Sequence, residues 1–166
     1  MPKLNIVLLS PEIPQNTGNI SRTCAVTGAS LHLIKPFGFE ISDRTVKRAG
    51  LDYWDKLDLH FYENFEAFLA ENAGAPLYFF TAKGARSFAR VEYPDGVFLV
   101  FGRESVGLPE DLLAANTERT LRIPMLAGCR CLNLSNAVAV AAYEVLRHWN
   151  FEGMSEEGIF AGNGEK

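Results

Sequence analysis

The chain of 166 residues has no apolar run that approaches the roughly 18 residues of a membrane-spanning helix, and it does not open with the charged and apolar regions of a secretory signal. We therefore expect a cytoplasmic protein with no membrane partner. Cysteine is scarce and odd in number, with only Cys24, Cys129 and Cys131 in the chain. A pair as close as the last two rarely forms a structural disulfide, and together with His148 it lacks the usual spacing of a zinc site. We expect reduced thiols and no bound metal.

An excess of positive charge is also missing, because the formal net charge is -4 and the isoelectric point is near 5.4. This balance excludes broad coating of nucleic acids or anionic membranes, so any anion-binding surface must be local. Acidic residues are absent from two segments, 13–39 and 119–143, and the second contains Arg119, Arg122 and Arg130. These two segments are candidates for such a local surface.

The sequence does contain the alternation of short apolar runs and helical patterns that is typical of an α/β domain. We predict one domain over residues 1–166 with a flexible tail from about residue 151, since 48% hydrophobic residues suffice for a sizeable core. Several strands are apolar on both faces, which indicates a mostly parallel sheet with helices on both faces. The expected strands are 4–10, 30–36, 76–82, 96–102 and 120–125, and the expected helices are 17–28, 43–56, 63–73, 109–116 and 134–149.

The stretch SPEIPQNTGNISRTC (10–24) follows the first strand and places Arg22 about one turn into the expected helix. A cation there opposes the helix macrodipole at a cost of about 0.3–1 kcal/mol, and no carboxylate lies at i±3 or i±4 to offset it. Either a distant acid or a ligand should therefore meet Arg22. The alternative is an ordinary turn between a strand and a helix, capped by Asn16 or Thr17.

A second polar segment, FGRESVGLPEDL (101–112), directly follows an apolar strand. Ligands of parallel α/β sheets bind at the carboxyl ends of strands, and Glu104 lies just beyond such an end. The alternative is a strand-to-helix turn with a solvated glutamate.

The third segment, LRIPMLAGCRCLNLSNAVAVAAYEVLRHW (121–149), has a cluster of short polar side chains at the start of a helix. One of Asn133, Ser135 and Asn136 should be the N-cap, and the others are suited to hydrogen bonds with ribose hydroxyls or with the backbone. The helix is apolar nearly all round from Ala137 to Ala142, so either a second subunit covers it or it is a central buried helix.

In this order, the motifs NTGNISR, FGRESVGLP and RIPM…CLNLSNAVAVAAYE resemble the SPOUT superfamily of RNA methyltransferases, and within it the SpoU/TrmH class of ribose 2′-O-methyltransferases. The similarity is closest to the small TrmL (YibK) group, which shares PEIPQNTGNI, RAGLDY and LNLSNAV, and it covers about residues 4–150. It implies an α/β sheet whose C-terminal part forms a trefoil knot, and it implies a homodimer. It also implies tRNA as the substrate, with the wobble nucleotide of tRNA-Leu (position 34, a cytidine or modified uridine) as the target.

The resemblance further implies S-adenosyl-L-methionine (AdoMet) as the methyl donor, held in the knot mainly by backbone groups and without a metal. The matching positions are Phe80, Thr81, Gly102, Glu104, Ile123, Met125, Cys131 and Leu132. Relatives of this group usually have serine at position 131, and proline and arginine at positions 103 and 106. A backbone contact at Cys131 tolerates that change.

The catalytic step is expected to involve Arg22, which matches the arginine that the family assigns to it. A guanidinium is a poor general base, so we expect Arg22 to donate to a substrate phosphate and to the developing 2′-alkoxide. Asn16, Ser135 and Asn136 would orient the ribose and the arginine.

A basic helix face with Arg44, Lys47 and Arg48 at i, i+3 and i+4 is the expected RNA-binding surface, and Lys83 and Arg86 extend it. On charge alone, a solvated helix face is the alternative. Two other functions stay open: 2′-O-methylation of another RNA such as ribosomal RNA, and RNA binding without catalysis. A nucleotide-dependent dehydrogenase is a weaker rival, because the chain lacks the glycine fingerprint of that class.

Overall fold

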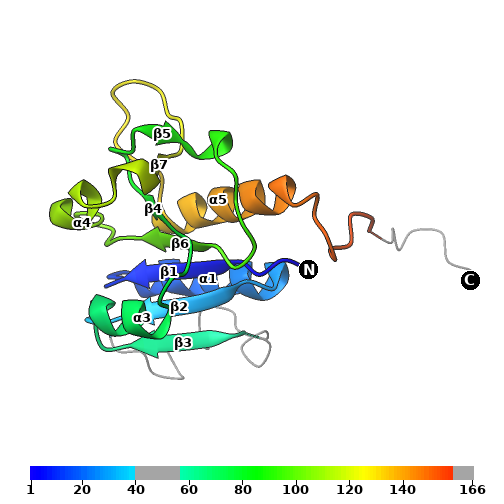
Figure 1. The fold of residues 1–166 in the computed structure, drawn as a ribbon, viewed down its shortest axis with the longest axis horizontal. Coiled ribbons are helices and arrows are strands. Elements are labelled where there is room, and N and C mark those ends of the chain that lie inside the picture. Colours follow the sequence, from blue (N-terminus) through cyan, green and yellow to red (C-terminus); the bar gives the residue numbers. More distant parts are fainter. Residues whose placement is uncertain (40–56, 159–166) are drawn as a thin grey trace, which may run out of the picture.

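The computed structural model describes residues 1–39 and 57–158 of the chain. Its centre is a seven-stranded sheet in the order β3-β2-β1-β6-β4-β7-β5, in which neighbouring strands are parallel (Figure 1). The strands are β1 (Asn5–Leu9), β2 (Ser30–Ile34), β3 (Leu59–Tyr62), β4 (Leu77–Phe80), β5 (Arg86–Ser87), β6 (Phe98–Phe101) and β7 (Thr120–Arg122). The parallel α/β sheet predicted from the sequence is confirmed.

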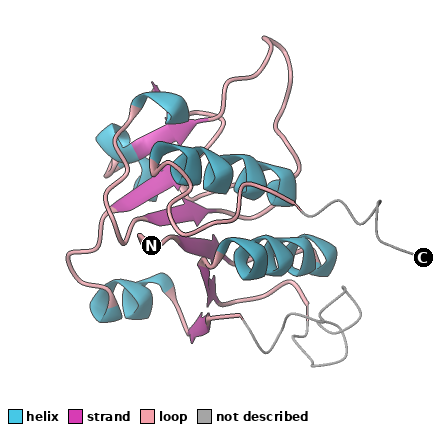
Figure 2. Ribbon diagram, turned by 90° about the vertical axis from the view of Figure 1, so that its right-hand side faces the viewer, coloured by secondary structure: helices cyan, strands magenta, loops and turns pink. Residues whose placement is uncertain are grey.

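Helices cover both faces of the sheet (Figure 2). The two longer helices, α1 and α5, pack against each other on one face, while the shorter α3 and α4 lie on the other. Their bounds are α1 (Pro14–Thr27), α3 (Phe65–Glu71), α4 (Glu110–Ala114) and α5 (Leu134–His148), and single 3-10 turns form η2 (Phe88–Arg90) and η3 (Thr117–Arg119). The predicted helix 43–56 lies outside the described residues.

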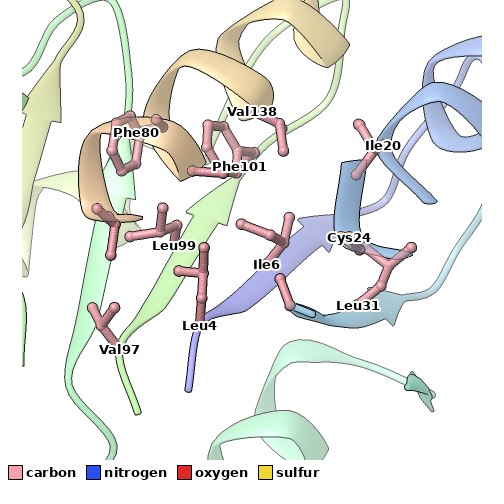
Figure 3. Close-up of a cluster of buried hydrophobic side chains, with 14 of the residues drawn as sticks. Leu4, Ile6, Ile20, Cys24, Leu31, Phe80, Val97, Leu99, Phe101 and Val138 are labelled. Carbon is pink, nitrogen blue, oxygen red and sulfur yellow. The ribbon is translucent and has the colours of Figure 1, made fainter. Parts of the chain in front are cut away.

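The core lies on both faces of the sheet because the central strands carry apolar side chains on both sides. On one face, Ile6 of β1 and Leu99 of β6 are fully buried in a cluster with Val138 of α5 (Figure 3). On the other face, a second cluster includes the fully buried Phe68 of α3. Burial of each such side chain contributes about 1.5–3 kcal/mol, so these two clusters hold the helices on the sheet.

Two strands, β3 and β5, escape the sequence analysis, and both lie at edges of the sheet. In β3, Phe61 is half exposed and only Tyr62 is buried, so the apolar pattern is weak. In β5, Arg86 and Ser87 pair with β7 and carry no apolar side chain at all. Edge strands of this kind are held by backbone hydrogen bonds, which leave no pattern in the side chains.

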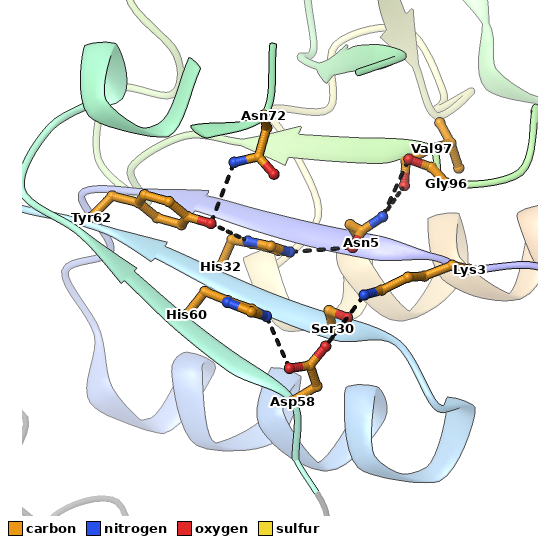
Figure 4. A network of polar contacts seen from close by, with 10 residues as sticks. All are labelled: Lys3, Asn5, Ser30, His32, Asp58, His60, Tyr62, Asn72, Gly96 and Val97. Atoms are coloured by element: carbon orange, nitrogen blue, oxygen red, sulfur yellow. Dashed lines mark hydrogen bonds and ion pairs between the residues drawn. The ribbon is translucent and has the colours of Figure 1, made fainter. Parts of the chain in front are cut away.

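A chain of side-chain hydrogen bonds crosses β1, β2 and β3 on the face of the sheet that α3 covers (Figure 4). The Tyr62 hydroxyl lies 3.0 Å from Nδ1 of His32, and Nε2 of His32 lies 3.2 Å from Oδ1 of Asn5. Because the Asn5 amide nitrogen donates to the Val97 carbonyl, its Oδ1 accepts from His32, and the Tyr62 hydroxyl then donates to Nδ1. Burial, helped by the neighbouring His60, lowers the pKa of His32 to about 4, so this imidazole is neutral at physiological pH.

The parallel arrangement brings the carboxyl ends of β1, β4, β6 and β7 to one edge of the sheet. The connections that leave these ends are residues 10–13, 81–85, 102–109 and 123–133. Polar segments that are far apart in the sequence therefore meet at this edge.

Candidate functional site

A pocket of about 630 Å³ opens at this carboxyl edge, the usual ligand position in an α/β sheet. Side chains from the connections after β1, β4, β6 and β7 line it. All eight residues predicted to hold a cofactor are among them: Phe80, Thr81, Gly102, Glu104, Ile123, Met125, Cys131 and Leu132. Asn16, near the start of α1, lines the same pocket.

Glu104 joins the loop after β6 to the start of α1. Its carboxylate accepts hydrogen bonds from the backbone N–H groups of Glu12 (2.8 Å) and Ile13 (3.2 Å) and from Nδ2 of Asn16 (3.0 Å). Ile13 is the N-cap residue of α1 and has no capping side chain, so Glu104 satisfies donors that a local cap would otherwise serve. The alternative of a solvated glutamate is therefore wrong.

This contact corrects the predicted start of α1. The helix begins at Pro14, which suits the first helical position because it lacks an N–H and has a helical φ. Asn16 and Thr17, the expected caps, lie inside the helix and are buried. Arg22 consequently lies in the third turn, with an exposed side chain, where the macrodipole has little effect. The electrostatic cost inferred from the sequence does not apply there.

Glu12 makes the reciprocal contact from the loop after β1. Its carboxylate accepts hydrogen bonds from Nε (3.0 Å) and Nη2 (2.8 Å) of Arg103, and from the backbone N–H (2.9 Å) and hydroxyl (3.0 Å) of Ser105. The hydrogen bonds from Ser105, followed by the contact with Arg103, lower the pKa of Glu12 below its usual value. Each of the two loops thus contributes one glutamate that binds the other loop. Sequence reasoning missed Glu12, although it is the acid that directly precedes the first acid-free segment.

The loop after β6 is folded tightly on itself at Gly102. The backbones of Arg103 and Gly107 exchange hydrogen bonds of 3.2 and 2.8 Å. A Cβ atom on Gly102 would lie 2.2 Å from the carbonyl carbon of Gly107 and 2.3 Å from the backbone nitrogen of Leu108. Only glycine fits this position, and the pocket wall there is backbone rather than side chain.

Asn133 connects the third loop to the other two. It is the N-cap of α5, and its Oδ1 accepts from the backbone N–H (2.9 Å) and hydroxyl (2.7 Å) of Ser135 and from the backbone N–H of Asn136 (3.4 Å). Its Nδ2 donates to Oδ1 of Asn16 at 3.0 Å. The expected cap within this cluster is thus Asn133, and the chain Glu104–Asn16–Asn133 links the starts of α1 and α5 to the loop after β6.

The other predicted site residues lie around this centre. Ser135 is buried and engaged in the cap, while Asn136 is exposed in the first turn of α5; neither is among the residues that line the pocket. Lys83 lines the pocket and forms an ion pair with Glu110. Arg86 donates from Nη1 to the Glu118 carbonyl at 3.1 Å. Three further predicted RNA contacts fall outside the described residues: Arg44, Lys47 and Arg48.

Comparison with known proteins identifies the family. A profile of the SpoU rRNA Methylase family matches residues 3–143. The chain belongs to this family. A protein of Aeromonas hydrophila named tRNA (cytidine(34)-2′-O)-methyltransferase is 48% identical over 155 residues, which cover 93% of this chain and 99% of that relative. The resemblance drawn from the three motifs is confirmed.

Solved structures agree with this membership of the SpoU family. One that concerns the 2-OH methylation of C/U34 on tRNA has a TM-score of 0.86 and 47% identity, and the match covers 91% of this chain and 99% of that one. An AdoMet-bound rRNA methyltransferase from Sinorhizobium meliloti has a TM-score of 0.77 and 27% identity, with 88% of this chain and 56% of that chain covered. The carboxyl-edge pocket therefore belongs to a SpoU methylase fold.

Two further observations concern the part of this SpoU family chain that the structure describes. Residues 1–39 and 57–158 include no group of three or more His, Cys, Asp and Glu side chains placed to hold a metal ion. Over the same residues, no helix combines the length and hydropathy of a membrane span.

Proposed function

We propose that this SpoU family member is an AdoMet-dependent tRNA 2′-O-methyltransferase that acts in the cytoplasm on the wobble nucleotide, position 34, of tRNA-Leu. The observation that carries the proposal is the pocket at the carboxyl edge, in which all eight residues predicted to hold AdoMet come together. The relative from Aeromonas hydrophila, named for this reaction, is 48% identical over nearly the whole chain.

The pocket residues fit AdoMet. A volume of about 630 Å³ lies within the range of small-molecule sites. Apolar side chains such as Phe80, Ile123 and Leu132 suit an adenine ring, while the tight turn at Gly102 presents backbone groups for hydrogen bonds. The Glu104 carboxylate is engaged at the start of α1, so position 104 would contact the cofactor through its backbone. When bound, AdoMet supplies a methyl group activated by the positive charge of its sulfonium.

The chain's own residues would position the RNA and stabilise charge. Asn16 is held from both sides by Glu104 and Asn133, so its side chain has a defined orientation at the pocket wall. Arg22 on the same helix would donate to a phosphate and to the developing 2′-alkoxide, since a guanidinium stabilises negative charge but does not accept a proton. Ser135 would act through the Asn133 cap, and the exposed Asn136 would contact the ribose.

Positively charged side chains next to the pocket support an RNA substrate. Arg130 lines the pocket and is exposed, and it lies in the acid-free segment 119–143. Lys83 and Arg86 lie on the connection after β4 and on β5 beside it. Together with the predicted contacts at 44–48, these cations would bind phosphates locally on an otherwise acidic protein.

The exposed face of α5 supports a homodimer. Val138, Ala141 and Ala142 are buried, which shows that the helix is covered on one side by its own chain. On the other side of the helix, Val140 and Tyr143 are 42% and 46% exposed. Packing against the core therefore accounts for the apolar residues on one side of α5 but not for those on the other. A second copy packed on this face would cover the remainder, and a mass measurement in solution tests it.

A trefoil knot in the C-terminal part is also proposed. Because β7 lies between β4 and β5, the segment that joins those two strands passes across β7. Gly84 in this segment is so close to β7 that a Cβ would lie 2.5 Å from the carbonyl carbon of Leu121. Farther along, the Tyr93 carbonyl accepts a 2.7 Å hydrogen bond from Nε1 of Trp149, just after α5. A loop that encircles the C-terminal segment would make both contacts.

The test is methyl transfer from labelled AdoMet to a tRNA-Leu transcript. The matched control is the same RNA with a 2′-deoxynucleotide at position 34, which lacks only the acceptor hydroxyl. We expect saturable AdoMet binding, and transfer to the first RNA but not to the second. Equal labelling of both RNAs would place the modified nucleotide elsewhere, and tRNA binding without transfer would favour a non-catalytic RNA-binding module.

A further inference from the structure

We propose that Cys129 and Cys131 form an oxidisable thiol pair whose reversible disulfide disables the cofactor pocket, an inference that rests on the proposed function. Both side chains are exposed and free. Both lie in the connection between β7 and α5, the yellow loop that arches beyond β5 in Figure 1. The susceptibility of a thiol to small oxidants rises with its exposure and with its thiolate character, whereas buried structural thiols are inert.

Cys24, the remaining cysteine, differs from this pair in its burial. Cys24 is fully buried in the core between α1 and the sheet, and burial raises its pKa to about 12. A thiol that is neither ionised nor accessible does not react. Oxidation of the folded protein is therefore directed to the pair in the loop.

Cys131 couples the pair to the pocket. It lines the pocket wall between Arg130 and Leu132, which line it as well. Two positions further along, Asn133 caps α5 and donates to Asn16. A change in the backbone at 129–131 therefore reaches both the wall that would hold AdoMet and the amide network behind it.

The geometry permits a bridge but does not favour a permanent one. Alternate residues have Cα atoms about 5.5–7 Å apart, which overlaps the range that a disulfide spans. The loop is already bent at this point, since the Cys129 N–H donates to the Leu126 carbonyl at 3.2 Å and Gly128 has a φ of +83°. A bridge across Arg130 would close a ring over a single intervening residue, which constrains the backbone. Strained, exposed disulfides are the readily reduced ones, as a reversible modification requires.

The chemical step needs a two-electron oxidant, and a hydroperoxide is the class we propose. One thiolate attacks the peroxide, the O–O bond breaks, an alcohol leaves, and a sulfenic acid forms. The second thiolate attacks that sulfur and expels hydroxide, which is protonated to water. In total, two S–H bonds and one O–O bond break, while one S–S bond and two O–H bonds form, the latter in the alcohol and the water. The two sulfurs lose two electrons and the peroxide gains them.

The experiment oxidises the folded protein with diamide, which takes up the same two electrons and two protons. Peptide mapping identifies the bridge, and calorimetry measures AdoMet binding before oxidation, after it, and after reduction with dithiothreitol. We expect a Cys129–Cys131 disulfide, loss of AdoMet binding, and full recovery on reduction. AdoMet present during treatment with iodoacetamide should also protect Cys131 more than Cys129.

The matched variant is Cys129→Ser, because Cys129 is not among the residues that line the pocket. It should bind AdoMet like the parent and keep that binding after diamide. The proposal is overturned if the mapped disulfide leaves AdoMet binding intact, if diamide gives no bridge within the loop, or if Cys129→Ser loses binding on oxidation as the parent does. If the reduced parent does not bind AdoMet at all, the proposed function fails, while the mapping still decides whether the pair forms.

Discussion

Replacing Glu104 with alanine removes the acceptor of three hydrogen bonds at the start of α1. Two of the donors are the backbone N–H groups of Glu12 and Ile13, and the third is the amide of Asn16. Loss of a helix cap costs about 0.5–2 kcal/mol, and a hydrogen bond to a charged group contributes about 1.5–3 kcal/mol. Because Glu104 is half-buried and water can replace part of its contacts, we expect the free energy of unfolding to fall by about 2–3 kcal/mol.

This loss is large enough to measure by urea denaturation followed by circular dichroism. For a domain of this size it corresponds to a fall in the melting temperature of about 4–12 °C. Glu110→Ala is the matched control, since that glutamate is 74% exposed, forms a surface ion pair with Lys83 and lies in the first turn of α4. Such pairs contribute about 0–1 kcal/mol. Glu104→Gln should lie between the two, because the amide keeps one acceptor oxygen.

Glu104 does not cap α1 if the free energy of unfolding of Glu104→Ala lies within about 0.5 kcal/mol of the parent value at an unchanged denaturant slope. The same result would remove the basis for treating Asn16 as a positioned side chain. If Glu104→Ala and Glu110→Ala lower stability equally, the carboxylate acts as a general surface charge and not as a remote cap.

Substitutions at Arg22, Gly102 and His32 test the site and the core. Arg22→Ala should lower methyl transfer about 10²–10³-fold while AdoMet affinity, measured by calorimetry, holds; transfer within threefold of the parent would make the arginine merely structural. Gly102→Ala should lower the free energy of unfolding by about 1–3 kcal/mol through overpacking, whereas Gly158→Ala, with open space around it, should not. Because burial lowers the pKa of His32 to about 4, the unfolded chain takes up a proton below about pH 6.5 that the folded protein refuses. The free energy of unfolding should thus fall as the pH is lowered from about 6.5 to about 4. In His32→Gln, the dependence of this free energy on pH should be weaker over the same range.

Much of the fold follows from local patterns in the sequence. The central strands can be recognised in the sequence because burial on both faces makes them continuously apolar, as in the run from Phe98 to Phe101. The edge strand Arg86–Ser87 cannot be found in this way, since it is held by backbone pairing alone. The three polar segments at strand ends are also visible, but the assignment of their residues to one cofactor came from the family resemblance.

The start of α1 shows why the rest could not be predicted. Local rules place the cap on the nearest short polar side chain, which gave Asn16 or Thr17. The actual acceptor is Glu104, separated from Asn16 by 88 residues, and it becomes available only when β1 and β6 pair in register. A helix boundary that is set by tertiary contacts cannot be predicted from the few residues around it. The electrostatic cost predicted at Arg22 was wrong for the same reason, because it assumed that the helix starts at residue 17 and not at Pro14.

The contacts hold the walls of the pocket in different ways. The loops after β1 and β6 are tied by the crossed pair Glu12 and Glu104, whose hydrogen bonds run through backbone as well as side chains. The connection after β7 is joined to its neighbours near its two ends, where Arg122 donates to the Ala82 carbonyl and Asn133 donates to Asn16. Between these ends most residues are exposed, and Ile123 and Met125 are half-buried against the pocket. The loop after β6 is fixed by its hydrogen bonds to the start of α1. We therefore expect a bound ligand, or a disulfide between Cys129 and Cys131, to change the conformation of the connection after β7.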